Sequence, residues 1–226
     1  MISLILAALF FIAIHLGVSG TRLRDRLVTA VGTTGYMAGF SIVSVVAIAW
    51  LVAAYNGAPY QPIWGQLLWW KPFQLTLMLP AFLFVVIGLT TPNPTSVAQE
   101  GLVRQPVRGI VHITRHPFLV GVAIWAGVHV IGNGDVASWL FFGSLGFAAV
   151  AGTVSIDAKR QRALGAAWDG FAAQTSIVPF AAILAGRTKL AAPDIGWWRP
   201  LAGVVAYAVL LGGHAHLFGV SPFPAW

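Results

Sequence analysis

Uncharged, mostly apolar runs alternate with charged segments along the whole chain. Six runs contain no Asp, Glu, Lys or Arg: residues 1–21, 27–70, 72–99, 117–134, 136–156 and 200–226. The second run is too long for one helix, and Asn56-Gly57-Ala58-Pro59 marks a turn within it. Because a transmembrane helix needs about 20 mostly apolar residues, the pattern predicts spans near residues 2–19, 33–55, 73–91, 117–133, 136–156 and 200–218.

One further uncharged segment, residues 170–186, competes as a seventh span. It is short, and it contains Pro179 and the polar sequence Gln174-Thr175-Ser176. We interpret it as an interfacial or re-entrant segment on the cytoplasmic side. The expected fold is therefore all-α: a single domain over residues 1–226, built as a polytopic integral membrane bundle of about six transmembrane helices.

The distribution of positive charge predicts the orientation, because Lys and Arg collect on the cytoplasmic side of membrane proteins. Twelve of the 13 Lys and Arg residues lie in three alternate segments, 20–32, 92–116 and 157–199, and the exception is Lys71. We therefore expect these segments in the cytoplasm and the N- and C-termini outside. Tryptophans at the predicted outer boundaries fit this orientation as interfacial rings: Trp64, Trp69, Trp70 and Trp139.

The composition excludes several classes of protein. Hydrophobic residues make up 58% of the chain and charged residues 8%, whereas a soluble domain carries about 25% charged residues. The absence of cysteine excludes disulfides, thiolate metal sites and a cysteine nucleophile. The net charge of +7 is explained by topology, so we expect no nucleic-acid partner. The expected partners are membrane lipid and a hydrophobic small-molecule substrate.

Histidine is the main ionisable residue at membrane depth. The six histidines are His15, His112, His116, His129, His214 and His216. Each could form one interhelical hydrogen bond, but ionisable groups within spans are usually functional, and the acidic residues all lie outside or at the ends of the spans. Since neutral imidazole binds metals and haem iron, a bis-His haem site suits this cysteine-free bundle.

Helix geometry sorts the histidines into two possible pairs. His15 lies near the cytoplasmic end of the first predicted span, and His116 opens the fourth at the same face. His129 is about 20 Å further along that helix, at 1.5 Å per residue, near the outer face. The pattern therefore predicts His15 with His116 as metal ligands, or alternatively His129 with His214 or His216.

Basic residues favour the inner pair. Four arginines are expected near it, and haem propionates need cationic partners: Arg22, Arg24, Arg108 and Arg115. The positive-inside bias alone also accounts for these four residues. Small residues beside His15, in the sequence Gly17-Val18-Ser19-Gly20, allow close helix packing and leave room for a flat macrocycle.

Several ordered stretches resemble the NnrU family of bacterial membrane proteins over nearly the whole chain. They are His15 to Gly20 with Arg22-Leu23-Arg24, Gly35-Tyr36 with Phe40-Ser41, Ile113 to Pro117 with Gly121, Trp125, His129 and Gly132-Asn133, Asp157 to Phe180, and His216 to Gly219. That family is similar to 15-cis-zeta-carotene isomerase, a haem b membrane enzyme that isomerises a polyene double bond. The resemblance implies haem b, with His15 and His116 in the positions of the haem histidines, and a bacterial inner (cytoplasmic) membrane location. It further implies an isomerase-like, redox-sensing or denitrification-linked role. The plant enzyme exchanges a cysteine ligand, which this chain lacks.

Two alternative functions stay open at this stage. Arg115-His116-Pro117 and the segment 157–180 resemble isoprenylcysteine carboxyl methyltransferases, in which the equivalent region binds S-adenosylmethionine. A membrane methyltransferase with that cofactor is therefore the second interpretation. The third is a non-enzymatic assembly or signalling protein whose histidines serve only in packing.

Overall fold

The computed structural model describes residues 1–224, with the backbone alone for Ala192. The longer helices in this range are α1 (Ile2–Ile12), continued by a π-helix η1 (Ala13–Val18), α2 (Arg22–Asn56), α3 (Lys71–Thr90), α4 (Pro117–Asn133), α5 (Val136–Leu164), α6 (Ala166–Gln174) and α9 (Trp198–Phe218). Short helical turns complete the set: η2 (Leu68–Trp70), η3 (Glu100–Arg104), η4 (Gly109–His112), α7 (Ala181–Leu184) and α8 (Ala192–Ile195). This is the all-helical bundle that the sequence predicts.

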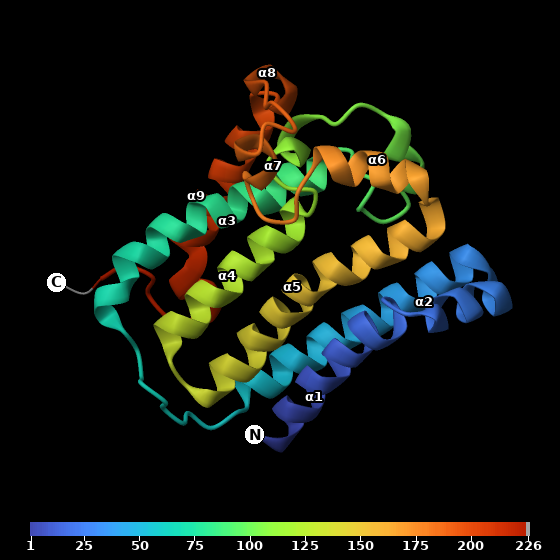
Figure 1. The fold of residues 1–226 in the computed structure, drawn as a ribbon. Coiled ribbons are helices and arrows are strands. Elements are labelled where there is room, and N and C mark those ends of the chain that lie inside the picture. The colour runs from blue at the N-terminus through green and yellow to red at the C-terminus, as the bar shows by residue number, and fades with distance from the viewer. Residues whose placement is uncertain (225–226) are drawn as a thin grey trace.

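Helix α5 lies at the centre of the arrangement. It packs against α4 on one side and against α1 and α2 on the other, while α3 packs on α4 and α9 packs on α3 (Figure 1). Leu4, Phe11 and Leu51 are buried between α1 and α2, where Ala137 at the start of α5 joins them. The bundle therefore has two groups of helices that meet on α5.

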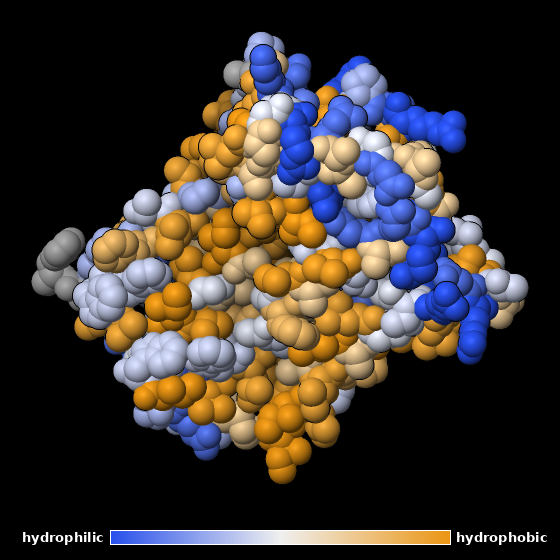
Figure 2. All heavy atoms as spheres, in the orientation of Figure 1, coloured by the Kyte–Doolittle hydropathy of each residue, from blue (hydrophilic) through white to orange (hydrophobic). Residues whose placement is uncertain are grey.

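The helices match the six predicted spans. Among the described residues, α2, α3 with η2, α5 and α9 are long and apolar enough to cross a membrane. The other two, Ile2–Val18 and α4, are apolar helices of 17 residues each, at the short end of the range for spanning. Figure 2 shows a broad hydrophobic band over these helices, with hydrophilic residues gathered at one end.

The second helix begins earlier than the sequence predicts. Residues 20–32 were expected as a cytoplasmic loop, but α2 begins at Arg22, where the Thr21 hydroxyl accepts a hydrogen bond from the Leu23 N–H at 3.2 Å. Gly32 then adopts φ 76° and ψ 164° inside the helix, a conformation open mainly to glycine. The three basic residues of this segment therefore lie on a helical extension that Gly32 bends away from the span.

The segment 170–186 does not form a seventh span. It contains the end of α6 and the four-residue α7, separated by a turn. Trp168 and Phe171 of α6 are buried against Val103 and Val111 of the segment 92–116. The interfacial interpretation therefore agrees with a structure in which this segment covers the ends of α4 and α5 (Figure 1).

Candidate functional site

A buried ion-pair network joins the start of α4 to the end of the apolar stretch of α5. The Arg115 guanidinium donates to both oxygens of the Asp157 carboxylate, with Nε at 2.9 Å from Oδ2 and 3.1 Å from Oδ1. The same carboxylate accepts a hydrogen bond from His116 Nε2 at 2.7 Å. Only 1% of the His116 side chain is exposed, against 12% for Arg115 and 15% for Asp157. We call these three residues the Asp157 network.

The loop before α4 is held in place by polar side chains. Asn93 Nδ2 and Thr95 Oγ1 both donate to the Arg115 carbonyl oxygen, at 2.9 and 2.7 Å. Thr114 Oγ1 donates to the Ile177 carbonyl oxygen at 2.7 Å and accepts from the His116 N–H at 3.2 Å. Because these partners satisfy the buried backbone and hydroxyl groups, the turn before α4 has a fixed geometry.

The environment of His116 favours its neutral form. Burial lowers the pKa of His116 below its ordinary value, and this outweighs the hydrogen bond to Asp157, which acts to raise it. Arg115 already neutralises the carboxylate, so a second positive charge on His116 is not needed. Since a carboxylate only accepts, Nε2 carries the imidazole proton, and Nδ1 is the nitrogen with a free lone pair.

A second buried cation lies one turn further along α5. Arg160 is 5% exposed; it pairs with the Glu100 carboxylate and donates from Nη2 to the Ser96 carbonyl oxygen at 2.9 Å. Burial is the largest single influence on the pKa of Glu100 and acts to raise it, but the hydrogen bond from Arg160, a backbone hydrogen bond and the charges of Arg160 and Arg24 together lower the pKa overall. The 92–116 segment is therefore tied to α5 by two ion pairs.

His15 lies in the π-helix η1, within an aromatic group on the opposite side of α5. Its Nδ1 donates to the Phe11 carbonyl oxygen at 2.8 Å, so Nε2 keeps a free lone pair. The imidazole centroid is 4.2 Å from the Phe11 ring and 5.5 Å from the Phe40 ring. Phe40 in turn stacks on Tyr36, and the Arg24 guanidinium lies 5.5 Å from the Tyr36 ring centroid. π-Helical turns are frequent at functional sites.

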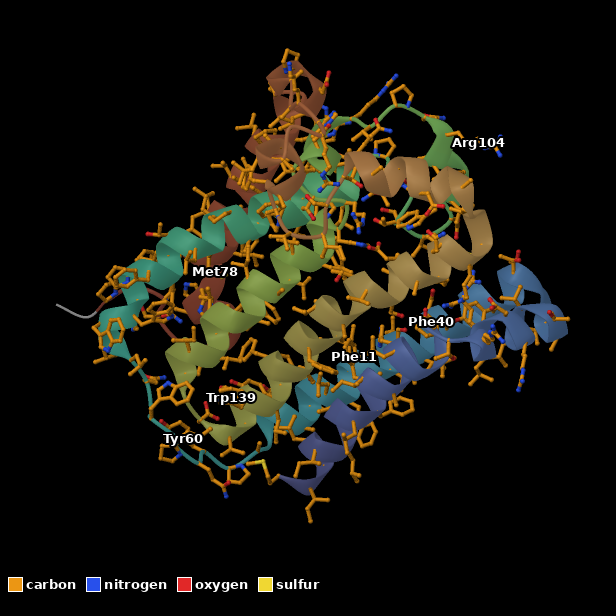
Figure 3. The ribbon with its side chains drawn as sticks, viewed as in Figure 1. Phe11, Phe40, Tyr60, Met78, Arg104 and Trp139 are labelled. Carbon is orange, nitrogen blue, oxygen red and sulfur yellow. The ribbon has the colours of Figure 1, made fainter. Side chains whose placement is uncertain are left out.

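The structure does not bring His15 and His116 together. Gly20, just past η1, lies so close to Ser155 that an added Cβ would overlap its hydroxyl. Asp157 is two residues further along α5, about 200° around the helix, where it meets His116. The two predicted ligands thus lie on different sides of α5, and Figure 3 shows Phe11 and Phe40 on the α1 and α2 side.

The rings of two outer histidines are each hydrogen-bonded to a backbone carbonyl group. His129 Nδ1 donates to the Trp125 carbonyl oxygen at 2.8 Å, and its ring stacks on Phe142 of α5 with centroids 4.6 Å apart. His214 Nδ1 donates to the Val220 carbonyl oxygen at 2.7 Å. His216 is exposed. The described residues contain no group of three or more His, Asp and Glu side chains arranged to hold a metal ion.

The predicted propionate partners are dispersed. Arg24 is near Tyr36, Arg115 belongs to the Asp157 network, and Arg22 is exposed at the start of α2. Arg108 is exposed and lines a small cleft together with Phe171 of α6. Of the four arginines, Arg24 alone is linked to His15 through the aromatic group.

The segments of the methyltransferase interpretation do meet. The Arg115 N–H donates to the Ser176 carbonyl oxygen at 2.9 Å, and the Phe180 N–H donates to the Ile113 carbonyl oxygen at 2.8 Å. The turn before α4 therefore packs against the end of the 157–180 segment. The Arg108 cleft adjoins this contact through Val111 and Phe171.

Sequence reasoning passed over two of the residues that organise these groups: Asp157 and Tyr36. Both entered only as members of family stretches. For Asp157 a signal was available, because it is the first acidic residue after a 21-residue uncharged run. For Tyr36 the pattern gave no such sign, because its contact with Arg24 spans the bend of α2 at Gly32.

Comparison with known proteins identifies the relatives of this chain. Residues 3–222 match the family model described as "NnrU protein". The chain is 28% identical over 210 residues to the chloroplastic 15-cis-zeta-carotene isomerase of Zea mays, covering 83% of this chain and 52% of that protein. It is 38% identical over 86 residues to the isomerase of the same name from Arabidopsis thaliana, covering 36% of this chain and 22% of that protein.

The chain spans about half the length, or less, of these two relatives. No solved structure matches it. The family match covers nearly every residue that the structure describes, including η1, the turn before α4 and the Asp157 region of α5. On this match the chain is a membrane protein of the NnrU family.

Proposed function

We propose that the protein is a haem b-dependent, isomerase-like membrane enzyme that acts on a hydrophobic polyene, with His15 as the residue that would hold the iron. The observation that carries the proposal is the setting of His15. Its Nδ1–H is engaged by the Phe11 carbonyl oxygen, which leaves the Nε2 lone pair for a metal. The relationship to 15-cis-zeta-carotene isomerases supports the reaction class.

The residues around His15 fit a haem group with one protein ligand. The Tyr36 hydroxyl is buried without a hydrogen-bond partner, and Arg24 beside it supplies a cation for a propionate. Gly17 and Gly39 have open space where a side chain would project. Phe11 and Phe40 supply the apolar contacts that a macrocycle needs.

Each residue of this group has a separate task. His15 would hold the iron, Arg24 would pair with a propionate, and Tyr36 would offer a hydroxyl donor. The bound iron supplies a centre that can withdraw electron density from a conjugated chain and lower the barrier to rotation about a double bond. Exposed apolar side chains along α2, such as Ile42 and Val45, give a polyene direct access from the bilayer.

The visible absorption spectrum of detergent-purified protein tests the proposal. His15→Ala should remove the haem, whereas His129→Ala should leave the spectrum intact. His129 is a matched control, because its Nδ1 donates to the carbonyl oxygen four residues earlier at the same 2.8 Å. Haem that survives His15→Ala, or a wild-type preparation without haem, would overturn the proposal.

The His116→Ala variant decides the second ligand. The pairing of His15 with His116 stays a prediction of the sequence. In this arrangement α5 separates the two residues and His116 Nε2 is committed to Asp157, so we expect His116→Ala to retain the haem spectrum. Loss of low-spin bands in that variant would establish the bis-His site instead.

The contact between the Arg115 turn and residues 176–180 favours one second candidate, a methyltransferase that binds S-adenosylmethionine near the Arg108 cleft. Calorimetric titration of the purified protein with S-adenosylmethionine distinguishes the two functions. A colourless protein that binds this cofactor would support the second. A bacterial inner membrane location and a link to denitrification stay predictions, and the two curated relatives are chloroplastic.

A further inference from the structure

The first turns of α2 form a helical segment distinct from the membrane span that follows. Thr21 caps this segment, and at its other end Gly32 adopts φ 76° and ψ 164°, which separates residues 22–31 from the rest of the helix. We call residues 22–31 the arm. It follows the π-helix η1 in the chain (Figure 1) and lies at the end of the molecule where hydrophobic and hydrophilic surfaces meet (Figure 2).

One flank of the arm is apolar and exposed. Leu23, Leu27 and Val31 are spaced by four residues, so they lie within about 80° of one another around the helix axis. Their exposed fractions are 43%, 36% and 58%, so this apolar flank stays open in the folded chain. The stripe continues the apolar, exposed surface of the span beyond Gly32, where Ile42 is 66% exposed.

A second flank of the arm is cationic. Arg22, Arg26 and Thr29 lie within about 60° of one another, and about 130° around the axis from the apolar flank. All three are exposed. Within residues 1–224, no carboxylate lies within 4.0 Å of Arg22 or Arg26, and the nearby Asp25 pairs with Arg24 at 3.4 Å. This flank therefore carries two positive charges without an acidic partner on the described chain.

The remaining face attaches the arm to the rest of the protein. Arg24 and Val28 lie on this face and are half-buried. The Arg24 guanidinium lies 5.5 Å from the centroid of the Tyr36 ring, which is beyond the bend at Gly32. This contact fixes the rotation of the arm about its own axis. Arg24 is thus engaged within the protein, and the two exposed flanks keep their directions.

The charge and polarity of the two flanks favour one partner, an anionic lipid surface. A helix with an apolar side and a cationic side lies in the plane of the membrane interface and is attracted to anionic lipids. A second copy of this chain is a poor partner for the cationic flank, because it carries six acidic residues against 13 basic ones. An anionic bilayer supplies both the negative charge and the apolar contact.

We propose that the arm is an interfacial helix that binds the surface of an anionic bilayer. Leu23, Leu27 and Val31 insert among the acyl chains, while Arg22 and Arg26 lie at the level of the lipid phosphates. Gly32 allows the chain to turn from the plane of the membrane into the span, because glycine adopts the positive φ that this turn requires.

The first test measures the surroundings of each flank. Because the chain contains no cysteine, one fluorophore can be attached to the full chain through Leu27→Cys or through Thr29→Cys. In vesicles of phosphatidylcholine and phosphatidylglycerol, we expect a nitroxide on the lipid chains to quench the label at position 27. Acrylamide in the water should quench the label at position 29. Labels at Ile42→Cys and at Arg104→Cys, which replace exposed residues of the span and of η3 (Arg104 is labelled in Figure 3), calibrate the two limits.

Two outcomes of this test would refute the interfacial helix. If the labels at positions 27 and 29 respond alike to both quenchers, the arm does not lie at the interface. If position 27 is shielded from both quenchers, a protein surface such as a second copy covers the apolar flank instead of lipid.

The second test measures the preference for anionic lipid. The nitroxide is carried either by phosphatidylglycerol or by phosphatidylcholine in vesicles of the same overall composition. We expect phosphatidylglycerol to be enriched around position 27 by about fivefold or more, the effect of one arginine near an anionic surface. The double variant Arg22→Gln, Arg26→Gln should abolish this enrichment. The matched control is Arg104→Gln, Arg162→Gln, which removes two exposed cations from other segments and should retain it. Equal quenching by both lipids in the unsubstituted arm, or equal losses in the two double variants, would overturn the proposal.

Discussion

Replacing the Asp157 carboxylate by an amide tests the main polar contact between α4 and α5. Asp157→Asn leaves the Arg115 guanidinium, which is 12% exposed, without its anion. It also replaces the charged oxygen that accepts the hydrogen bond from His116 Nε2 by a neutral amide oxygen. Removing one partner of a buried pair destabilises a protein by about 3–5 kcal/mol. Because the amide oxygen still accepts one hydrogen bond and Asp157 is 15% exposed, we expect a loss of about 2–4 kcal/mol.

The assay is the free energy of unfolding in mixed micelles, followed by tryptophan fluorescence. The control is Asp25→Asn, whose partner Arg24 is 3.4 Å away while Asp25 is 59% exposed; exposed pairs contribute about 1 kcal/mol or less. The double variant Arg115→Met, Asp157→Leu should recover part of the loss, because it removes both buried charges together. If Asp157→Asn destabilises no more than Asp25→Asn, the network does not hold the two helices.

Three further predictions concern topology, packing and haem retention. A reporter fused after Trp226, which lies outside the described residues, should be active only on the outer side of the membrane; a cytoplasmic signal would contradict the orientation inferred from charge. Gly20→Val should destabilise the contact of η1 with α5 by about 1–3 kcal/mol, because a Cβ would lie 2.7 Å from the Leu16 carbonyl oxygen and overlap Ser155; an unchanged unfolding free energy would contradict that packing. Arg24→Gln should lower the haem content of the purified protein without changing the ligation of the haem that remains, and unchanged content would return Arg24 to the positive-inside explanation.

The site was only partly predictable. His15 and Arg24 could be chosen from the sequence, because histidine is rare within a transmembrane span and basic residues follow soon after it. Their link through Phe40 and Tyr36 could not, since it depends on the rotation of α2 relative to η1. The hydrophobic pattern also did not predict the π-helical turn at His15. Without it, helix periodicity alone does not tell which way the imidazole faces.

The sequence by itself determined the six apolar helices, their expected orientation and the exclusion of thiolate chemistry. These properties follow from the transfer of whole segments into a bilayer and from the side on which charges collect, and both can be read from local composition. The beginning of α2 was misplaced, because hydropathy marks the apolar core of a helix and not its charged extension past Gly32.

Only the tertiary structure decided which polar residues meet. Asp157 is 41 residues from His116 and 42 from Arg115, and they come together because α5 runs back along α4. The same helix separates His116 from His15, although the sequence predicts both near the same face of the membrane. Which helices lie next to one another in a bundle depends on side-chain packing between them. The sequence gives the depth of each residue along its own span, but it does not give the neighbours of that span.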